Sequence, residues 1–114
     1  MKVLIVEDNQ AMRRLLSKIV SQWAEVFECT DGSEALLCYE ANQPDWVLMD
    51  IHMKEVSGIE ATRRLKAAHK DVRVIMVTNY NDARLREIAT MAGACGYVLK
   101  EDLSVLQQLL TTAS

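Results

Sequence analysis

Short apolar runs rich in β-branched residues alternate along this chain with stretches of helical periodicity, and no other feature constrains its fold as strongly. Such alternation is typical of βα units repeated around a parallel sheet. Four of the five runs are almost continuously apolar, as strands covered on both faces should be, whereas the second is more polar and suits a sheet edge. We therefore predict an α/β fold with strands at residues 3–6, 25–29, 46–49, 74–77 and 96–99.

The segments between the predicted strands carry the signals of amphipathic helices. The clearest apolar stripe has the i, i+3, i+4, i+7 spacing of one buried face and consists of Met12, Leu15, Leu16, Ile19, Val20 and Trp23. Side-chain oxygens suited to cap a helix start occur at Asn9, Ser33, Ser57, Asn81 or Asp82, and Asp102. Gly93 is placed to end the fourth helix in a left-handed conformation. Together these signals predict a helix after each strand.

The composition indicates the class of protein and its cellular location. A chain of 114 residues that is 50% hydrophobic and 25% charged fits one globular domain spanning residues 1–114. No apolar run approaches the roughly 18 residues that span a bilayer, so we expect a cytoplasmic protein without membrane contact. The net charge of −3 argues against direct binding of nucleic acid. The three cysteines form no CxxC pair and are expected to be reduced and mostly buried.

Chemically reactive side chains directly follow four of the predicted strands. Glu7 and Asp8 follow the first strand, Asp50 the third, Thr78 the fourth and Lys100 the fifth. In an open parallel α/β sheet, ligands bind beyond the carboxyl ends of the strands, where these positions meet. The sequence therefore predicts one site built from three carboxylates, a hydroxyl and an ammonium.

Such a group of carboxylates favours a bound Mg²⁺. Three ionised carboxylates repel one another unless a cation joins them, and oxygen ligands suit Mg²⁺ better than zinc or copper. The two histidines, His52 and His69, lack the spacing of zinc ligands. With charge balanced by the metal and the Lys100 ammonium, a carboxylate can attack phosphorus and form an acyl phosphate. Asp50 is the predicted nucleophile because the third strand is central.

The order and placement of these residues resemble the receiver domains of response regulators in two-component systems. The resemblance covers essentially the whole chain and rests on Glu7, Asp8, Asp50, Met53, Gly58, Thr78, Tyr97 and Lys100. It implies a flavodoxin-like (βα)5 fold whose five-stranded parallel sheet has the order 2-1-3-4-5. It also implies that a histidine kinase phosphorylates Asp50, with Mg²⁺ held by Asp8, Asp50 and the backbone carbonyl of His52. Glu7 would act through water.

The resemblance also implies a switch and a surface that reports it. Thr78 and Lys100 would contact the phosphoryl group, and inward movement of Thr78 would let Tyr97 turn inward. The readout would be the face of the fourth helix, fifth strand and fifth helix, which would contact an output domain or a second copy of the chain. Residues 96–103 look most like receivers attached to a helical DNA-binding output domain, so transcription is the favoured output. A stand-alone receiver acting by protein interaction is the alternative.

Several positions depart from the usual pattern or vary within it. Lys54 stands where proline is common, which predicts either a looser loop after the third strand or a cation that meets the incoming phosphodonor. Asn79 replaces a small residue, and its bulk would narrow access to Asp50 and slow phosphoryl transfer. His52 and Tyr80 occupy the positions thought to tune the lifetime of the phosphoryl group, in a direction that the sequence leaves open.

Three alternative functions fit the sequence less well. A Mg²⁺-dependent phosphohydrolase with an aspartyl-phosphate intermediate usually has a second aspartate two residues after the nucleophile, where this chain has His52. A flavin-binding module would need a Ser/Thr-rich phosphate loop after the first strand, where Glu7 and Asp8 would repel phosphate. A pseudo-receiver would not need the full acid set. We therefore expect a signalling phospho-acceptor, whose only catalysis is its own Mg²⁺-dependent phosphorylation and dephosphorylation.

Overall fold

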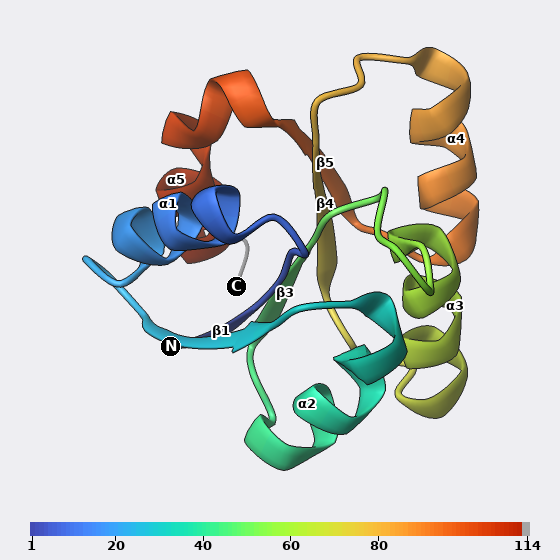
Figure 1. The fold of residues 1–114 in the computed structure, drawn as a ribbon, viewed down its shortest axis with the longest axis horizontal. Helices are drawn as coiled ribbons and strands as arrows, with labels where there is room; N and C mark the ends of the chain where they lie inside the picture. The colour runs from blue at the N-terminus through green and yellow to red at the C-terminus, as the bar shows by residue number, and fades with distance from the viewer. Residues whose placement is uncertain (113–114) are drawn as a thin grey trace.

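In a computed structural model that describes residues 1–112, five parallel strands form one sheet at the centre of the molecule (Figure 1). The strands are β1 (Lys2–Val6), β2 (Glu25–Cys29), β3 (Trp46–Met49), β4 (Val74–Thr78) and β5 (Gly96–Leu99). Their order in the sheet is β2-β1-β3-β4-β5. The prediction of a flavodoxin-like α/β fold is confirmed, as is the edge position of the more polar second strand.

Helices cover both faces of this sheet. They are α1 (Gln10–Val20), α2 (Ala35–Asn42), α3 (Gly58–Ala68), α4 (Ala83–Ala92) and α5 (Leu106–Thr112), with 3₁₀ turns η1 (Gly32–Glu34) and η2 (Lys100–Val105). α1 and α5 pack on one face, and α2, α3 and α4 pack on the other (Figure 1).

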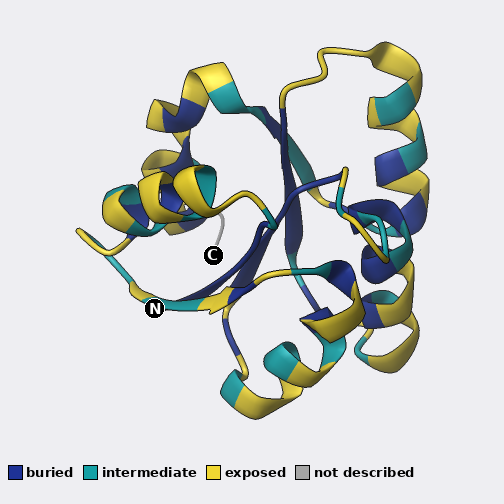
Figure 2. Cartoon of the chain, viewed as in Figure 1, coloured by how far each residue is buried: buried dark blue, intermediate teal, exposed yellow. Residues whose placement is uncertain are grey.

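Strand residues alternate between the two faces and supply both halves of the core. In β1, Leu4 and Val6 join the cluster under α2, α3 and α4, whereas Val3 and Ile5 join the cluster under α1 and α5. All four of these side chains are fully buried, and the strands at the centre of Figure 2 are correspondingly dark. Burial on both faces explains why these strands read as continuous apolar runs.

Most of the predicted helix signals are confirmed. Asn9 accepts a hydrogen bond from the Met12 amide at the start of α1, and Ser57 accepts one from the Glu60 amide at the start of α3. Of the two candidates for α4, Asp82 is the capping residue. Gly93 ends that helix with a φ of 115°.

Five expectations were wrong. Leu15 of the predicted buried stripe is exposed, because it lines a cavity that is open to solvent. Ser33 lies inside η1, which Asp31 caps instead, because the aspartate side chain accepts from the Ser33 amide. Asp102 lies at a kink inside η2, where its φ and ψ are non-helical. Trp23 lies beyond the end of α1, although it still packs against the core. Cys95 is exposed, because it lies on the turn that precedes β5.

Within residues 1–112, no helix combines the length and the apolar character needed to cross a membrane.

Candidate functional site

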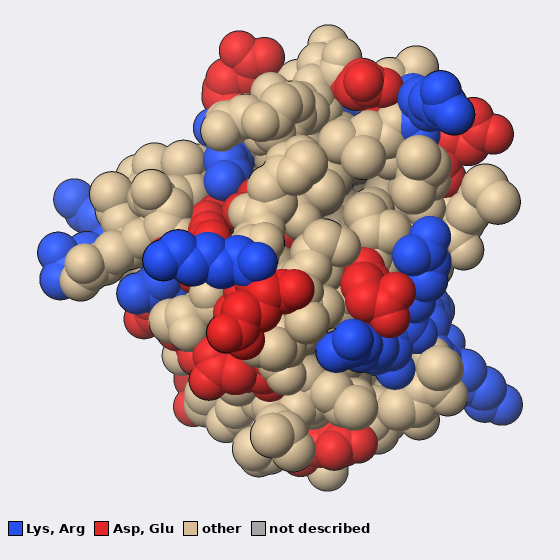
Figure 3. Space-filling view, turned by 45° about the vertical axis from the view of Figure 1, so that its right-hand side comes forward, with Lys and Arg blue, Asp and Glu red and all other residues tan. Residues whose placement is uncertain are grey.

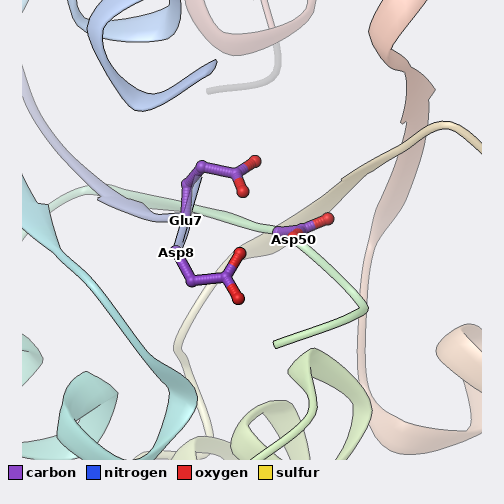
Figure 4. A group of neighbouring side chains, drawn as sticks. All are labelled: Glu7, Asp8 and Asp50. Atoms are coloured by element: carbon purple, nitrogen blue, oxygen red, sulfur yellow. The ribbon is translucent and has the colours of Figure 1, made fainter. Parts of the chain in front are cut away.

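Three acids meet at the carboxyl edge of the sheet, the edge at which the parallel strands end. Glu7 and Asp8 follow β1, and Asp50 follows β3, the neighbouring strand. The Asp50 amide donates to the Val6 carbonyl, so the ladder between these strands continues to Asp50, the predicted nucleophile. In Figure 4 the carboxylates extend from these two strand ends toward a common space, and one oxygen from each lies within 4.8 Å of the others. The predicted convergence is therefore present.

Two members of this acid cluster, Glu7, Asp8 and Asp50, are largely removed from water, and Asp8 is the more exposed one. Glu7 is 1% exposed and Asp50 is 7% exposed. Burial raises the pKa of both groups above their ordinary values, because a low-dielectric environment disfavours the charged form. The charge of Asp50 raises the pKa of Glu7 further, and the charge of Asp8 acts in the same direction on Asp50.

Lys100 from the end of β5 joins the cluster as its buried cation. Its Nζ lies 2.9 Å from Glu7 Oε1 and 3.2 Å from Asp50 Oδ1, and its side chain is 9% exposed. Burial alone would lower the pKa of Lys100, but the hydrogen bond to Glu7 and the charges of Asp50 and Glu7 outweigh it and raise that pKa. The ammonium in turn opposes the upward shifts in the pKa values of both acids.

The cluster can hold a metal ion. Three carboxylates and one ammonium leave a formal charge of −2 when all are ionised (−3 + 1), which a divalent cation would balance. Glu7 Oε1 is buried, and within residues 1–112 it meets no partner other than the Lys100 ammonium. The donors are all oxygen atoms, as hard cations prefer.

Thr78 and Tyr97 lie on the adjacent strands β4 and β5, and β4 pairs with β3, the strand that Asp50 follows. Thr78 is buried, and its Oγ1 accepts a hydrogen bond of 3.2 Å from the Tyr80 amide. The Tyr97 hydroxyl donates to the Tyr80 carbonyl at 2.6 Å, and the Arg86 guanidinium lies 4.3 Å from the centre of the tyrosine ring. Both side chains are thus attached to the loop that follows β4.

Residues 3–111 match the family model of the response regulator receiver domain. The chain belongs to this family. It is 37% identical over 106 residues to the transcriptional regulatory protein YdfI of Bacillus subtilis, covering 90% of this chain and 49% of that protein. It is 38% identical over 100 residues to the chemotaxis protein CheY of Halobacterium salinarum, covering 87% of this chain and 83% of that protein.

Solved structures agree with this assignment. A two-component response regulator of the LuxR family from Aurantimonas sp. SI85-9A1 superposes with a TM-score of 0.88 at 27% identity, covering 97% of this chain and 85% of that one. The chain spans about half the length of the first two curated relatives, 49% of YdfI and 44% of DegU from Brevibacillus brevis.

The residues predicted to tune this receiver domain are exposed. His52 and Tyr80 are exposed, and their rings meet edge to face with centroids 4.6 Å apart. Asn79 and Lys100 line a cavity of about 300 Å³ together with residues of α1. Lys54 is exposed and shares a second cavity, of 470 Å³, with Asp8.

The start of α3 approaches the nucleophile position closely enough to require glycine. A Cβ at Gly58 would lie 1.9 Å from the Asp50 carbonyl oxygen, a distance at which atoms overlap. The Gly58 amide donates to the Ile51 carbonyl at 2.7 Å, which closes the base of the loop between β3 and α3. Gly58 was noted in the sequence as part of the resemblance, and the contact supplies its physical reason.

Two side chains that support the site had no role in the sequence analysis. Arg13 donates from Nη1 to the Glu7 carbonyl at 2.9 Å and forms an ion pair with Glu28 on β2, at 3.2 Å. Asp31 binds backbone amides of two separate segments. Arg13 lies on a helix that looked solvated on that face, and Asp31 beside Gly32 suggested only a turn, so neither signal pointed to the site.

Proposed function

We propose that this receiver domain accepts a phosphoryl group on Asp50 from a histidine kinase in a Mg²⁺-dependent reaction. As a member of its family, the chain takes part in phosphorelay signalling. The observation that carries the finer proposal is the buried cluster in which Lys100 pairs with Glu7 and Asp50. A carboxylate kept beside a cation and other acids in a nearly dry site is typical of a reactive centre.

The proposed metal ligands are Asp8, Asp50 and the backbone carbonyl of His52, with Glu7 acting through water. When bound, Mg²⁺ would neutralise the excess negative charge and hold phosphoryl oxygens. An Asp50 carboxylate oxygen forms the new bond to phosphorus as the bond from phosphorus to the kinase histidine nitrogen breaks, and that nitrogen keeps the electron pair. Lys100 then meets the phosphoryl oxygens with its ammonium.

Thr78 and Tyr97 form the proposed switch. The Thr78 hydroxyl accepts from the Tyr80 amide, which leaves its own hydrogen available to donate to a phosphoryl oxygen. Movement of Thr78 would therefore pull on the loop whose Tyr80 carbonyl holds Tyr97. The α4-β5-α5 face would change as Tyr97 shifts, and it is the proposed contact for an output domain or a second copy of the chain.

Exposed residues near the acid cluster have two proposed roles: they set the lifetime of the phosphoryl group, and they lie where the kinase docks. His52, Asn79 and Tyr80 are exposed at its margin, where they can tune the phosphoryl lifetime by controlling the approach of water. The kinase is proposed to dock near α1, beside the cavity that Asn79 and Lys100 line.

Transcriptional control is the proposed output, because the relative YdfI is named a transcriptional regulatory protein and this chain matches half of it. The domain itself is not proposed to touch nucleic acid or membrane. Its net charge is −3, and acidic and basic side chains lie close together on the face in Figure 3. A stand-alone receiver is the second candidate. It is favoured because the match to the chemotaxis protein CheY covers 83% of that protein. The setting in both cases is the cytoplasm, with residues 1–114 as one receiver domain.

Incubation with acetyl phosphate tests whether Asp50 accepts a phosphoryl group in the presence of Mg²⁺. Intact mass should show one added phosphoryl group with Mg²⁺, none in excess chelator, and none in Asp50→Asn. Asp45→Asn is the matched control, because Asp45 lies at the opposite edge of the sheet and accepts a hydrogen bond from the Lys2 amide. Equal modification of the Asp50 variant, or undiminished modification in chelator, would refute the assignment.

The switch has a separate test. Tyr97 side-chain NMR signals are compared with and without beryllofluoride and Mg²⁺, the beryllofluoride standing in for the phosphoryl group. The signals should shift as Asp50 becomes loaded. A Tyr97 environment that stays unchanged at full loading would show that the switch runs through another element.

A further inference from the structure

The carboxylate of Asp31 joins two loops that are distant in the sequence. Oδ2 accepts hydrogen bonds from the amides of Ser33 at 2.8 Å and Val56 at 3.2 Å, and Oδ1 accepts one from the amide of Glu55 at 3.2 Å. Burial alone would raise the pKa of Asp31, but these hydrogen bonds outweigh it and hold the pKa below its ordinary value. The carboxylate is therefore ionised at neutral pH and binds the amides as a charged acceptor.

Glu55 and Val56 belong to the loop between β3 and α3, which begins directly after Asp50. A second contact comes from Gly32, whose Cβ position would lie 2.4 Å from the Val56 carbonyl oxygen. The backbone at Gly32 therefore packs directly against the backbone at Val56. With the Gly58 amide bound to the Ile51 carbonyl, the loop is attached at two places. His52, Met53 and Lys54 lie between the Ile51 attachment and the Asp31 attachment.

The loop and Asp31 also share a cavity with the acid cluster. Asp8, Asp31, Lys54 and Glu55 are among the residues that line this cavity of 470 Å³. A change in the position of the loop would therefore alter the distance between Lys54 and Asp8 as well as the position of the His52 carbonyl. A loop attached only at Ile51 would sample more positions, because it would no longer be held across the cavity.

We propose that Asp31 is a positioning residue for the acceptor site: its carboxylate holds residues 52–56, and with them the His52 carbonyl that follows Asp50 and the Lys54 side chain in the cavity that Asp8 lines. The inference rests on the proposed function, since it assigns the held carbonyl to Mg²⁺ binding. Asp31 acts through the loop and contacts neither the metal nor the phosphoryl group. Had it served only to cap η1, its bond to the Ser33 amide would suffice, and the bonds to Glu55 and Val56 would have no role.

The test compares Asp31→Asn and Asp31→Ala with Asp45→Ala. Asp45 also binds a backbone amide across elements, that of Lys2 at 2.8 Å, but at the opposite edge of the sheet. Calorimetric titration with Mg²⁺ should give a Kd that is weaker by about tenfold in Asp31→Ala, at the low end of the effects of outer-shell changes. Asp31→Asn should fall between it and wild type, because one carboxylate oxygen becomes an amide donor. Asp45→Ala should match wild type.

A rate measurement separates positioning from general destabilisation. Phosphorylation of Asp31→Ala by acetyl phosphate should be slow at limiting Mg²⁺ and should recover most of the wild-type rate at saturating Mg²⁺. Circular dichroism at the assay temperature checks that Asp31→Ala is folded, since Mg²⁺ binding would also stabilise a partly unfolded domain. A folded variant without a positioning defect would show a rate deficit independent of Mg²⁺. That result, or an unchanged Mg²⁺ Kd in Asp31→Ala, would overturn the inference. Wild-type protein that failed to bind Mg²⁺ would instead overturn the proposed function, and the inference with it.

Wild-type protein provides a test that needs no variant. In amide hydrogen exchange, the Glu55 and Val56 amides should be protected relative to the Lys54 amide, because Asp31 accepts from the first two. Because this measurement uses wild-type protein, it can be made even if Asp31→Ala does not fold. Exchange of all three amides at the same unprotected rate would refute the attachment.

Discussion

At the amino edge of the sheet, where the strands begin, charged side chains lie in solvent and hold the backbone locally. Asp45 accepts from the exposed Lys2 amide, and Arg73 donates to the Asp45 carbonyl while its guanidinium lies 4.2 Å from the centre of the Trp46 ring. At the carboxyl edge, by contrast, Glu7 and Asp50 are almost fully buried and share one lysine. The same residue types thus occur in opposite environments.

The difference between the edges concerns the cost of burying charge. Exposed charges contribute little to stability, and each can be replaced at small cost. A buried group of acids with a net negative charge destabilises the folded chain unless cations balance it. A group of this kind is therefore better suited to the proposed acceptor chemistry than to stabilising the fold. Three experiments, taken from the largest effect to the smallest, test this contrast between the edges.

The largest difference between the two edges should be in the reactivity of their cysteine thiols. Cys29 ends β2 at the carboxyl edge, where burial raises its pKa to about 12, whereas Cys95 precedes β5 at the amino edge and is exposed. Because only the thiolate reacts, Cys95 should react with Ellman's reagent at pH 8 at least about a hundredfold faster than Cys29. Single-cysteine variants, made by changing the other cysteines to serine, allow each rate to be measured. Equal rates in the folded state would contradict the described burial of Cys29.

Removal of the lysine at each edge should have unequal effects on stability. Lys100→Ala leaves Glu7 and Asp50 without their shared cation and should lower the free energy of unfolding by about 2 kcal/mol in metal-free buffer at pH 7.5. Lys2→Ala should change it by less than about 0.5 kcal/mol, because that side chain is exposed. Urea unfolding followed by circular dichroism measures both. Equal effects would mean that Lys100 behaves as a surface lysine.

The pH dependence of stability should show the smallest effect. The pKa values of Glu7 and Asp50 are raised on folding from ordinary values of 4.5 and 3.8. Their contribution to stability is therefore fully present below those ordinary values and is lost as the pH rises through the raised ones. Asp50→Asn removes the contribution of Asp50, so stability should fall less steeply as the pH rises above 3.8.

The change in slope for Asp50→Asn should stay below about 1.4 kcal/mol per pH unit, the value for one proton. Urea unfolding in chelator at several pH values measures it. Asp45→Asn at the amino edge is the control and should leave the slope at its wild-type value. A slope that becomes steeper in Asp50→Asn would show that the folded state does not raise the pKa of Asp50.

Much of the fold and of the candidate site was predictable from the sequence, because those features depend on local patterns. The runs that became β3 and β5 have the predicted bounds, and the runs at β1 and β4 are each one residue longer. Once the strands are parallel, the residues after them must meet at one edge, so the meeting of Glu7, Asp50 and Lys100 follows from chain order. The family resemblance supplied the strand order.

Contacts between loops could not be predicted in the same way. The sequence suggested Ser33 as a helix cap, yet Asp31 caps η1 and also binds amides 24 and 25 residues away. Likewise, Tyr97 was expected to respond to Thr78, and its hydroxyl is bound to the Tyr80 carbonyl. Nothing in the local pattern distinguishes these partners from neighbouring candidates.

By itself, then, the sequence determined the alternation of strands and helices and the residues that stand at the strand ends, because hydrophobic periodicity acts over a few residues at a time. Only the tertiary structure decided that Lys100 pairs with both Glu7 and Asp50, and that Asp31 holds the loop after β3. Those contacts depend on hydrogen bonds of about 3 Å between separate segments. Such distances are set by how the packed core brings the loops together.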